Sequence, residues 1–233
     1  MLISWIKKTT LLDYPGKVAT IIFTLGCNLR CGFCHNPEFV LPSEVEKKMG
    51  DLIPEENFFA FLEERKGFLD GVVICGGEPT LHKDLPEFAK KIKDLWLLVK
   101  LDTNGSNPTI LQHLLQENLV DYIAMDIKHI PGQYSEITNV SIPIKRYSES
   151  IELIMTSQID YEFRTTVIQW VHTPIDIAVI AQSIHGAKKY ILQNFRTGKL
   201  LDPDFDGKSF SHDELIQLRD AASPFVQSCS IRL

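Results

Sequence analysis

Basic residues are not in excess in this chain of 233 residues: 24 Lys and Arg stand against 30 Asp and Glu, and the formal net charge is −6. A large nucleic-acid interface needs a basic face, so we expect no nucleic-acid partner. No apolar run approaches the ~18 residues of a membrane-spanning helix, so we expect no membrane partner. Met1–Thr10 has no apolar core followed by a cleavage site, so we expect no signal peptide.

Linkers rich in glycine and serine, internal repeats and low-complexity stretches are also absent. The apolar content of 44% and the charged content of 23% are those of a globular protein, and the length suits one barrel-type domain. We therefore expect a single domain over 1–233. It would have N-terminal strands over 1–24, a core over 25–195, and a C-terminal helix and strand over 196–233.

Cysteine is scarce as well, yet three of the five cysteines lie together, at Cys27, Cys31 and Cys34 in the stretch GCNLRCGFCHNP. Their spacing is too short for a disulfide framework, and three thiols cannot all pair with one another. Clustered cysteines without a secretory signal indicate a reducing compartment, so we expect a cytoplasmic protein.

Thiolates spaced this closely usually bind a soft metal ion or an iron–sulfur cluster. In a four-iron cluster, three cysteine ligands leave one iron free to bind another molecule. Zinc bound by the three cysteines and His35 has suitable ligand types, although adjacent residues such as Cys34 and His35 rarely converge on one tetrahedral ion. Three unrelated buried thiols are the third interpretation. The spacing by itself leaves all three open.

Apolar runs alternate with helical patterns along the chain, which is typical of an α/β domain with a parallel sheet. The expected strands are Ile3–Ile6, Val18–Thr24, Gly71–Cys75, Leu97–Leu101, Val120–Met125, Tyr161–Val167, Lys189–Gln193 and Val226–Ile231. The expected helices are Pro54–Arg65, Asp84 or Leu85 to Asp94, Pro108–Glu117, Tyr147–Ser157, Pro174–Ile184 and Asp213–Ala221. We expect Glu38–Ile53 to be a connector without a clear period and Asp13–Gly16 to be a turn. About six strand–helix units predict a sheet that is open or curled into a partial barrel.

Polar and glycine-rich residues gather just beyond the ends of several expected strands. They are Cys27–Cys34, Gly76–Glu78, Asp102–Asn104, Asp126–Lys128, and Gln193 with Asn194. Any one of these stretches could be an ordinary polar loop. Because the carboxyl ends of parallel strands meet at one edge, five in succession indicate a shared site there.

The cysteine spacing together with Gly76-Gly77-Glu78 resembles the radical S-adenosylmethionine superfamily, and more closely its small glycyl-radical-enzyme activases. The strings that carry the resemblance are KTTLLDYPGK from Lys8, CGFCHNP from Cys31, DGVVICGGEPTL from Asp70, KLDTNGS from Lys100, DYIAMDIK from Asp121, EFRTTV from Glu162 and YILQNF from Tyr190. Among the activases, these strings most resemble the anaerobic ribonucleoside-triphosphate reductase activating proteins. The resemblance implies a partial (β/α)6 TIM-type barrel, preceded by a short N-terminal strand or hairpin.

The resemblance also implies cofactors and a chemistry. Cys27, Cys31 and Cys34 would ligate three irons of a 4Fe–4S cluster, and S-adenosylmethionine would bind the fourth iron through its amino and carboxylate groups. Reductive cleavage would give a 5′-deoxyadenosyl radical that removes hydrogen from a glycine of a partner enzyme. A flavodoxin- or ferredoxin-like donor would supply the electron.

Several further residues match positions that contact S-adenosylmethionine in the family. Phe33 and His35 would lie near the adenine, unless they pack in the core and cap the loop. Glu78 would accept a hydrogen bond from the cofactor's amino group, and the two preceding glycines would allow close backbone approach. The other positions are Asp102, Asn104, Asp126 and Lys128, which would face the methionine and ribose or a nearby cation, and Arg164, which would hold a carboxylate or the ribose. Solvated loop carboxylates and a strand-end ion pair are the structural alternatives for these residues.

Asp13 resembles the aspartate of a D-G-P-G segment that contacts the substrate glycine loop in related activases. Tyr14 replaces the first glycine of that segment here. A turn started by the Asp13 side chain is the alternative interpretation.

Two departures from the family pattern concern the C-terminal half. Activases of pyruvate formate-lyase have a histidine where this chain has Gln193-Asn194-Phe195, so we expect Gln193 or Asn194 to take its place. Cys75 and Cys229 stand alone, and we interpret Cys75 as a buried strand thiol. No second cysteine cluster is present, which excludes the larger activases with a ferredoxin-like insertion.

Three functions remain as hypotheses. The first is activation of anaerobic ribonucleotide reductase, and the second is activation of pyruvate formate-lyase or another glycyl-radical enzyme. The third is a zinc-stabilised binding protein without catalysis.

Overall fold

The apolar runs of the sequence form one eight-stranded sheet in the computed structural model, which describes residues 1–233. The strands lie side by side in the order of the chain. They are β1 (Ile3–Thr10), β2 (Ala19–Thr24), β3 (Gly71–Gly76), β4 (Leu98–Thr103), β5 (Tyr122–Asp126), β6 (Asp160–Val167), β7 (Tyr190–Asn194) and β8 (Cys229–Arg232). The first pair, β1 with β2, is antiparallel, and every later pair is parallel.

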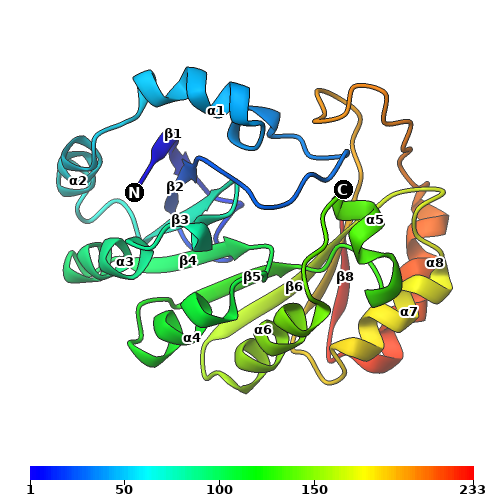
Figure 1. Cartoon of the computed structure of the whole chain (residues 1–233). Helices are drawn as coiled ribbons and strands as arrows, with labels where there is room; N and C mark the ends of the chain where they lie inside the picture. Colours follow the sequence, from blue (N-terminus) through cyan, green and yellow to red (C-terminus); the bar gives the residue numbers. More distant parts are fainter.

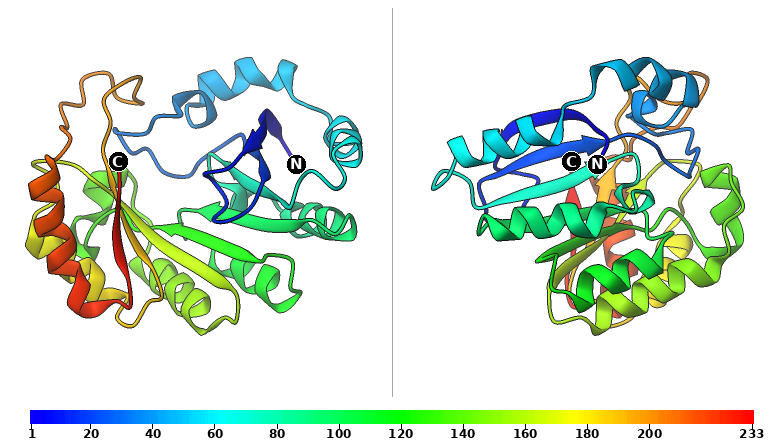
Figure 2. Two further views of the ribbon diagram at one scale, coloured as in Figure 1. Left: turned by 180° about the vertical axis from the view of Figure 1, so that it is seen from behind. Right: turned by 60° about the vertical axis from the view of Figure 1, so that its left-hand side comes forward.

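Helices connect the parallel strands and cover the outside of the curved sheet (Figure 1, Figure 2). They are α1 (Pro42–Lys48), α2 (Glu55–Glu64), α3 (Leu85–Asp94), α4 (Pro108–Gln116), α5 (Tyr134–Thr138), α6 (Ile144–Thr156), α7 (Pro174–Ser183) and α8 (His212–Ala222). Six strand–helix units therefore run from β2 to α8, and the end strands β1 and β8 do not pair with each other. The prediction of a partial (β/α)6 barrel with an N-terminal hairpin is confirmed. No helix combines the length and the apolar character needed to cross a bilayer.

The central strands are buried on both faces, as their continuous apolar runs predict. A large cluster of buried side chains fills the space between the sheet and the helices, with Val72, Ile74 and Val99 among its members. A smaller cluster lies around Tyr14, whose ring stands 5.9 Å from the ring of Tyr122. The turn between β1 and β2 is therefore anchored to the sheet by a buried aromatic side chain.

The structure differs from the sequence prediction mainly at weakly patterned segments. The expected connector Glu38–Ile53 contains α1, which buries none of its residues and therefore has no apolar period to recognise. Helix α5 was not predicted, and α6 begins three residues before the expected Tyr147. Strand β1 extends to Thr10, and β8 begins at Cys229 rather than at Val226.

Candidate active site

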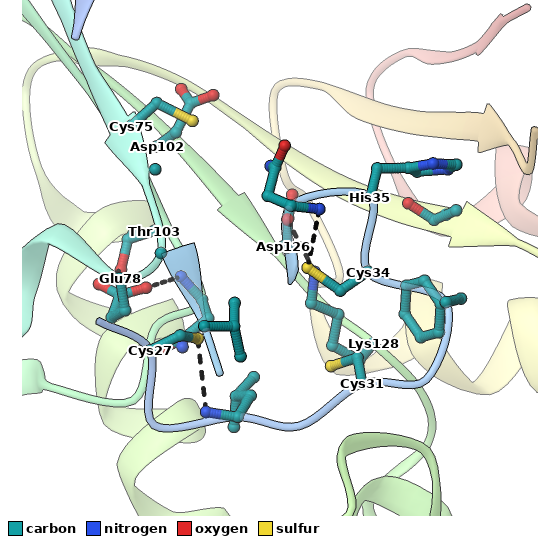
Figure 3. A pocket seen from close by; sticks show the side chains of 18 of the residues that line it. Cys27, Cys31, Cys34, His35, Cys75, Glu78, Asp102, Thr103, Asp126 and Lys128 are labelled. Carbon is teal, nitrogen blue, oxygen red and sulfur yellow. Dashed lines mark hydrogen bonds and ion pairs between the residues drawn. The ribbon is translucent and has the colours of Figure 1, made fainter. Parts of the chain in front are cut away.

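The loop that follows β2 carries the three clustered cysteines and lines a pocket of about 230 Å³ at the carboxyl ends of the strands. Figure 3 shows Cys75 and Asp102 on one side of this inner pocket and Cys31 and Cys34 on the other. All the predicted site residues except Asp13 and Gln193 line it: Cys27, Cys31, Phe33, Cys34, His35, Gly76, Gly77, Glu78, Asp102, Asn104, Asp126, Lys128 and Arg164. The residues expected to share one edge of the sheet therefore line a single cavity there.

The cysteine thiols are held out of water. Burial raises the pKa of Cys27 to about 12 and that of Cys31 to about 11, and it also raises the pKa of Cys34. Nucleophilic cysteines need a lowered pKa, so these three are poorly suited to covalent catalysis. No three His, Cys, Asp or Glu side chains converge closely enough to hold a single metal ion. All three cysteines instead line the inner pocket.

His35 also turns away from the cysteines, so the zinc interpretation lacks its fourth ligand. Its ring stacks on Phe195 at a centroid distance of 5.9 Å and an interplanar angle of 29°. Phe33 is buried, and the ammonium of Lys128 lies 5.8 Å from the centre of its ring. The backbone carbonyl of Lys128 is within 3.0 Å of Nε2 of the buried His172, which fixes this turn of the pocket wall.

The two glycines after β3 allow the loops of β2 and β3 to touch. The backbone N–H of Gly77 donates to the carbonyl of Thr24 at 2.9 Å, and that of Glu78 donates to the carbonyl of Gly26 at 2.7 Å. Gly76 has a φ of +124°, a region that L side chains rarely adopt. A Cβ atom on Gly77 would overlap the carbonyl oxygen of Gly26. Both glycines are therefore needed for close packing against the cysteine loop.

Glu78 is a buried carboxylate that joins the ends of β3 and β4. It accepts hydrogen bonds from the backbone N–H of Thr80 at 3.1 Å, from Oγ1 of Thr103 at 2.7 Å and from the backbone N–H of Asn104 at 2.6 Å. Burial raises its pKa, although these donors favour the charged form. The Glu78 carboxylate is thus both a structural anchor and part of the pocket lining.

A chain of alternating charges crosses the ends of β4, β5 and β6. Arg164 donates from Nε to Oδ1 of Asp126 at 2.7 Å and from an Nη atom to Oδ2 of Asp102 at 3.0 Å. Lys128 donates to the second oxygen of Asp126 at 2.8 Å, and Lys100 pairs with the second oxygen of Asp102. Burial opposes ionisation of both carboxylates, but the neighbouring cations hold the pKa of each below its usual range. Both are therefore ionised at neutral pH, and neither is a solvated loop residue.

A second, outer pocket of about 650 Å³ adjoins the first. The two pockets share His35, Asp102, Arg164 and Thr166 in their linings. Asp13 and Gln193, the two predicted site residues absent from the inner pocket, line the outer one. Asp13 accepts hydrogen bonds from the hydroxyl of Thr10 and from Lys7, the latter at 3.5 Å. These contacts run back to β1 and not forward into the turn Asp13–Gly16, so they do not match the alternative interpretation, and Asp13 faces the outer pocket.

Sequence reasoning missed several residues of the site. Lys100 lies within the apolar strand β4 and was interpreted only as part of that strand, yet its side chain reaches the charge network. Cys75 lines the inner pocket, and burial raises its pKa to about 12. Asn28 bonds to the loop after β4, and its position beside Cys27 was the one available signal.

Comparison with known proteins places this architecture among described families. Residues 21–174 match the Radical SAM superfamily. A Methanocaldococcus jannaschii protein named as a candidate glycyl-radical enzyme activating enzyme is 34% identical over 99% of this chain and 95% of its own length. The pyruvate formate-lyase-activating enzyme of Staphylococcus epidermidis is 33% identical over 51% of this chain and 49% of its own.

The fold is similar to that of solved structures with little sequence in common. The crystal structure of SuiB from Streptococcus suis superposes with a TM-score of 0.66 at 15% identity. The superposition covers 91% of this chain and 48% of SuiB.

Proposed function

The chain belongs to the radical SAM superfamily and to its branch of glycyl-radical-enzyme activating enzymes, and we propose that its partner is an anaerobic ribonucleoside-triphosphate reductase. The strings quoted above, which lie between Lys8 and Phe195 and resemble the activating proteins of that reductase, support this partner. The single cysteine cluster sets aside the larger activases with a ferredoxin-like insertion. A pyruvate formate-lyase-activating enzyme is 33% identical over 51% of this chain, so pyruvate formate-lyase is the second candidate partner.

The inner pocket fits the cofactors of this family. Cys31 is buried, Cys27 and Cys34 are half-buried, and all three line the pocket. A cationic cluster would offset the cost of ionising them, because a thiol that coordinates a metal releases its proton to solvent and binds as the thiolate. We propose Cys27, Cys31 and Cys34 as the ligands of a 4Fe–4S cluster with one open iron. When bound, the cluster and S-adenosylmethionine would supply an electron and a carbon-centred radical.

The polar residues of the inner pocket would hold S-adenosylmethionine. Glu78 keeps an oxygen, Oε2, with a single donor, so it can accept a further hydrogen bond from an ammonium group. Lys128 and Arg164 provide positive charge that suits a carboxylate. Phe33, whose ring lies beside Lys128, and His35 provide ring surface against which the adenine would pack. The remaining proposed contacts are Gly76, Gly77, Asp102, Asn104 and Asp126.

The outer pocket is where we place the glycine-bearing segment of the partner. It adjoins the inner pocket through Asp102 and Arg164, so a backbone inserted there would approach the cofactors directly. Its lining is mainly polar, with Asp13, Gln193 and Asn194 among its members. Side-chain amides and carboxylates of this kind can pair with the peptide groups of an extended segment. We propose Gln193 for the position where relatives have a histidine.

Anaerobic reconstitution followed by a partner assay tests the function. The reconstituted protein should turn brown, bind about four irons, and produce 5′-deoxyadenosine from S-adenosylmethionine with a reduced flavodoxin or ferredoxin. Incubated with each candidate partner, it should generate a glycyl radical, detected by electron paramagnetic resonance, on the reductase and not on pyruvate formate-lyase. The opposite selectivity would establish the second candidate. Colourless protein with one bound zinc ion would contradict both.

Replacing Asp13 by Ala tests the role of the outer pocket. We expect the yield of partner glycyl radical to fall at least about tenfold, because a charged hydrogen-bond partner worth about 1.5–3 kcal/mol is lost. Cluster absorbance and 5′-deoxyadenosine formation without partner should not change. Asp51→Ala, which removes an exposed carboxylate elsewhere, is the control and should behave as the unaltered protein does. Loss of iron–sulfur absorbance in Asp13→Ala would refute a role confined to partner contact.

A further inference from the structure

Asn28 is the only residue of Gly26–Pro37 whose side chain hydrogen-bonds to side chains elsewhere in the protein. Its Nδ2 donates to Oγ of Ser106 at 2.8 Å, and its Oδ1 accepts from Nδ2 of Asn104 at 2.9 Å. Both partners lie in the loop after β4 and are buried, with Ser106 only 1% exposed. The amide of Asn28 is thus bound at both ends, one as donor and one as acceptor.

The bonds of Asn28 continue into the pocket wall. Oδ1 of Asn104 accepts from the backbone N–H of Ser106 at 2.9 Å, which closes a ring of hydrogen bonds through the three residues. The backbone N–H of Asn104 donates to Glu78 at 2.6 Å. A continuous hydrogen-bonded path therefore runs from the residue beside Cys27 to the buried carboxylate of Glu78.

The rest of the cysteine loop is held differently. In its middle, the backbone N–H of Arg30 donates to the carbonyl of Thr138 at 2.8 Å, and Nδ2 of Asn139 donates to the carbonyl of Arg30 at 3.0 Å. At its far end, the carbonyl of Cys34 accepts from the backbone N–H of Leu201 at 2.8 Å. These contacts fasten the loop to α5 and to the C-terminal segment, neither of which carries Glu78 or Asn104.

We propose that Asn28 is a positioning residue, which sets Cys27 against the pocket wall formed by Glu78 and Asn104. This inference rests on the proposed function, since that wall is where S-adenosylmethionine would be held. Three cysteines and the other loop contacts suffice to assemble a cluster. The distance from the cluster to the wall depends on Asn28, together with the backbone bond from Glu78 to the carbonyl of Gly26. Asn28 therefore affects the affinity for S-adenosylmethionine, which must contact the open iron and the pocket wall at the same time.

The test compares cofactor binding in reconstituted holoprotein. In Asn28→Ala we expect an unchanged iron content, because no ligand is removed. Titration with S-adenosylmethionine, followed by the change in the electron paramagnetic resonance spectrum of the reduced cluster, should give an affinity about tenfold weaker, equivalent to ~1.4 kcal/mol. Ser106→Ala should also weaken binding, because it removes the acceptor of the hydrogen bond that Asn28 donates. The double variant should be no weaker than Asn28→Ala, because both substitutions remove the same bond.

Asn139→Gly is the matched control, since it removes one amide hydrogen bond from the same loop without touching the pocket wall, and glycine tolerates the positive φ of this position. We expect it to bind S-adenosylmethionine as the unaltered protein does. Unchanged affinity in Asn28→Ala, equal weakening in Asn139→Gly, or additive effects of Asn28→Ala and Ser106→Ala would each overturn the proposal. If the unaltered cluster does not respond to S-adenosylmethionine at all, the proposed function fails and this inference fails with it.

Discussion

Gly77→Ala is expected to abolish cluster binding, although the substitution adds only one methyl group. The new Cβ would overlap the carbonyl oxygen of Gly26 and lie within 2.6 Å of its carbonyl carbon. Backbone atoms cannot move aside as a flexible side chain can, so the cysteine loop must shift as a whole. Overpacking of this kind costs about 1–3 kcal/mol, and here it also breaks the bond from Glu78 to Gly26.

Iron content after anaerobic reconstitution is the measurement for Gly77→Ala. Gly132→Ala is the control, because a Cβ at that position would meet no atom within 4 Å and its φ is not positive. It should bind as much iron as the unaltered protein. A Gly77→Ala protein with full iron content would show that the two loops can separate without losing the site.

Arg164→Met is expected to destabilise the fold by about 3–5 kcal/mol, the usual cost of removing one partner from a buried ion pair. The guanidinium contacts both Asp102 and Asp126, and each carboxylate would keep only one lysine. The stability of Arg164→Lys should lie between that of the unaltered protein and that of Arg164→Met, because an ammonium cannot span both carboxylates as the guanidinium does. Chemical denaturation at neutral pH measures the free energies of unfolding. Arg219→Met is the control, since it breaks an exposed pair with Asp220 worth at most about 1 kcal/mol.

The pH dependence of the stability difference between the unaltered protein and Arg164→Met shows whether lost charge pairing causes it. Folding lowers the pKa of Asp102 and Asp126, so their contribution to stability is present above their unfolded pKa of about 4 and is lost as the pH falls through the lower folded values. Removing Arg164 takes away most of this contribution. The stability difference between the two proteins should therefore be largest near pH 7 and should narrow below about pH 4. A difference that stays constant with pH would indicate lost packing instead of lost charge pairing.

The strands could be predicted because local patterns determine them. Runs such as Gly71–Cys75 are apolar throughout, which fits strands covered on both faces. These patterns left the sheet open or curled, and the resemblance to the superfamily supplied the barrel and with it the strand order. The polar residues at the strand ends indicated where the inner pocket lies, whereas Phe33, His35 and Arg164 were assigned to it by the resemblance.

The parts that escaped prediction did so for different reasons. Helix α1 buries nothing, so no periodicity marks it. Lys100 is tolerated inside β4 because Asp102, two residues further along the same strand, accepts from it. That local pair was overlooked because the strand was interpreted only by its apolar residues. The bond from Asn28 to Ser106 joins residues 78 positions apart, and although each stands in a recognisable string, nothing in either string shows that the two side chains meet.

The backbone bonds that Leu201 and Asp202 make to the cysteine loop have a consequence for synthesis. The three thiols leave the ribosome well before Leu201 and Asp202, whose backbone N–H groups bond to the carbonyls of Cys34 and Gly32. Chains fold from the N-terminus as they emerge, and neighbouring strands of this sheet are also neighbours in sequence. The cysteine loop is therefore the first part of the site to appear and the last to be covered. A nascent chain exposed to an oxidant would be most vulnerable at these thiols during that interval.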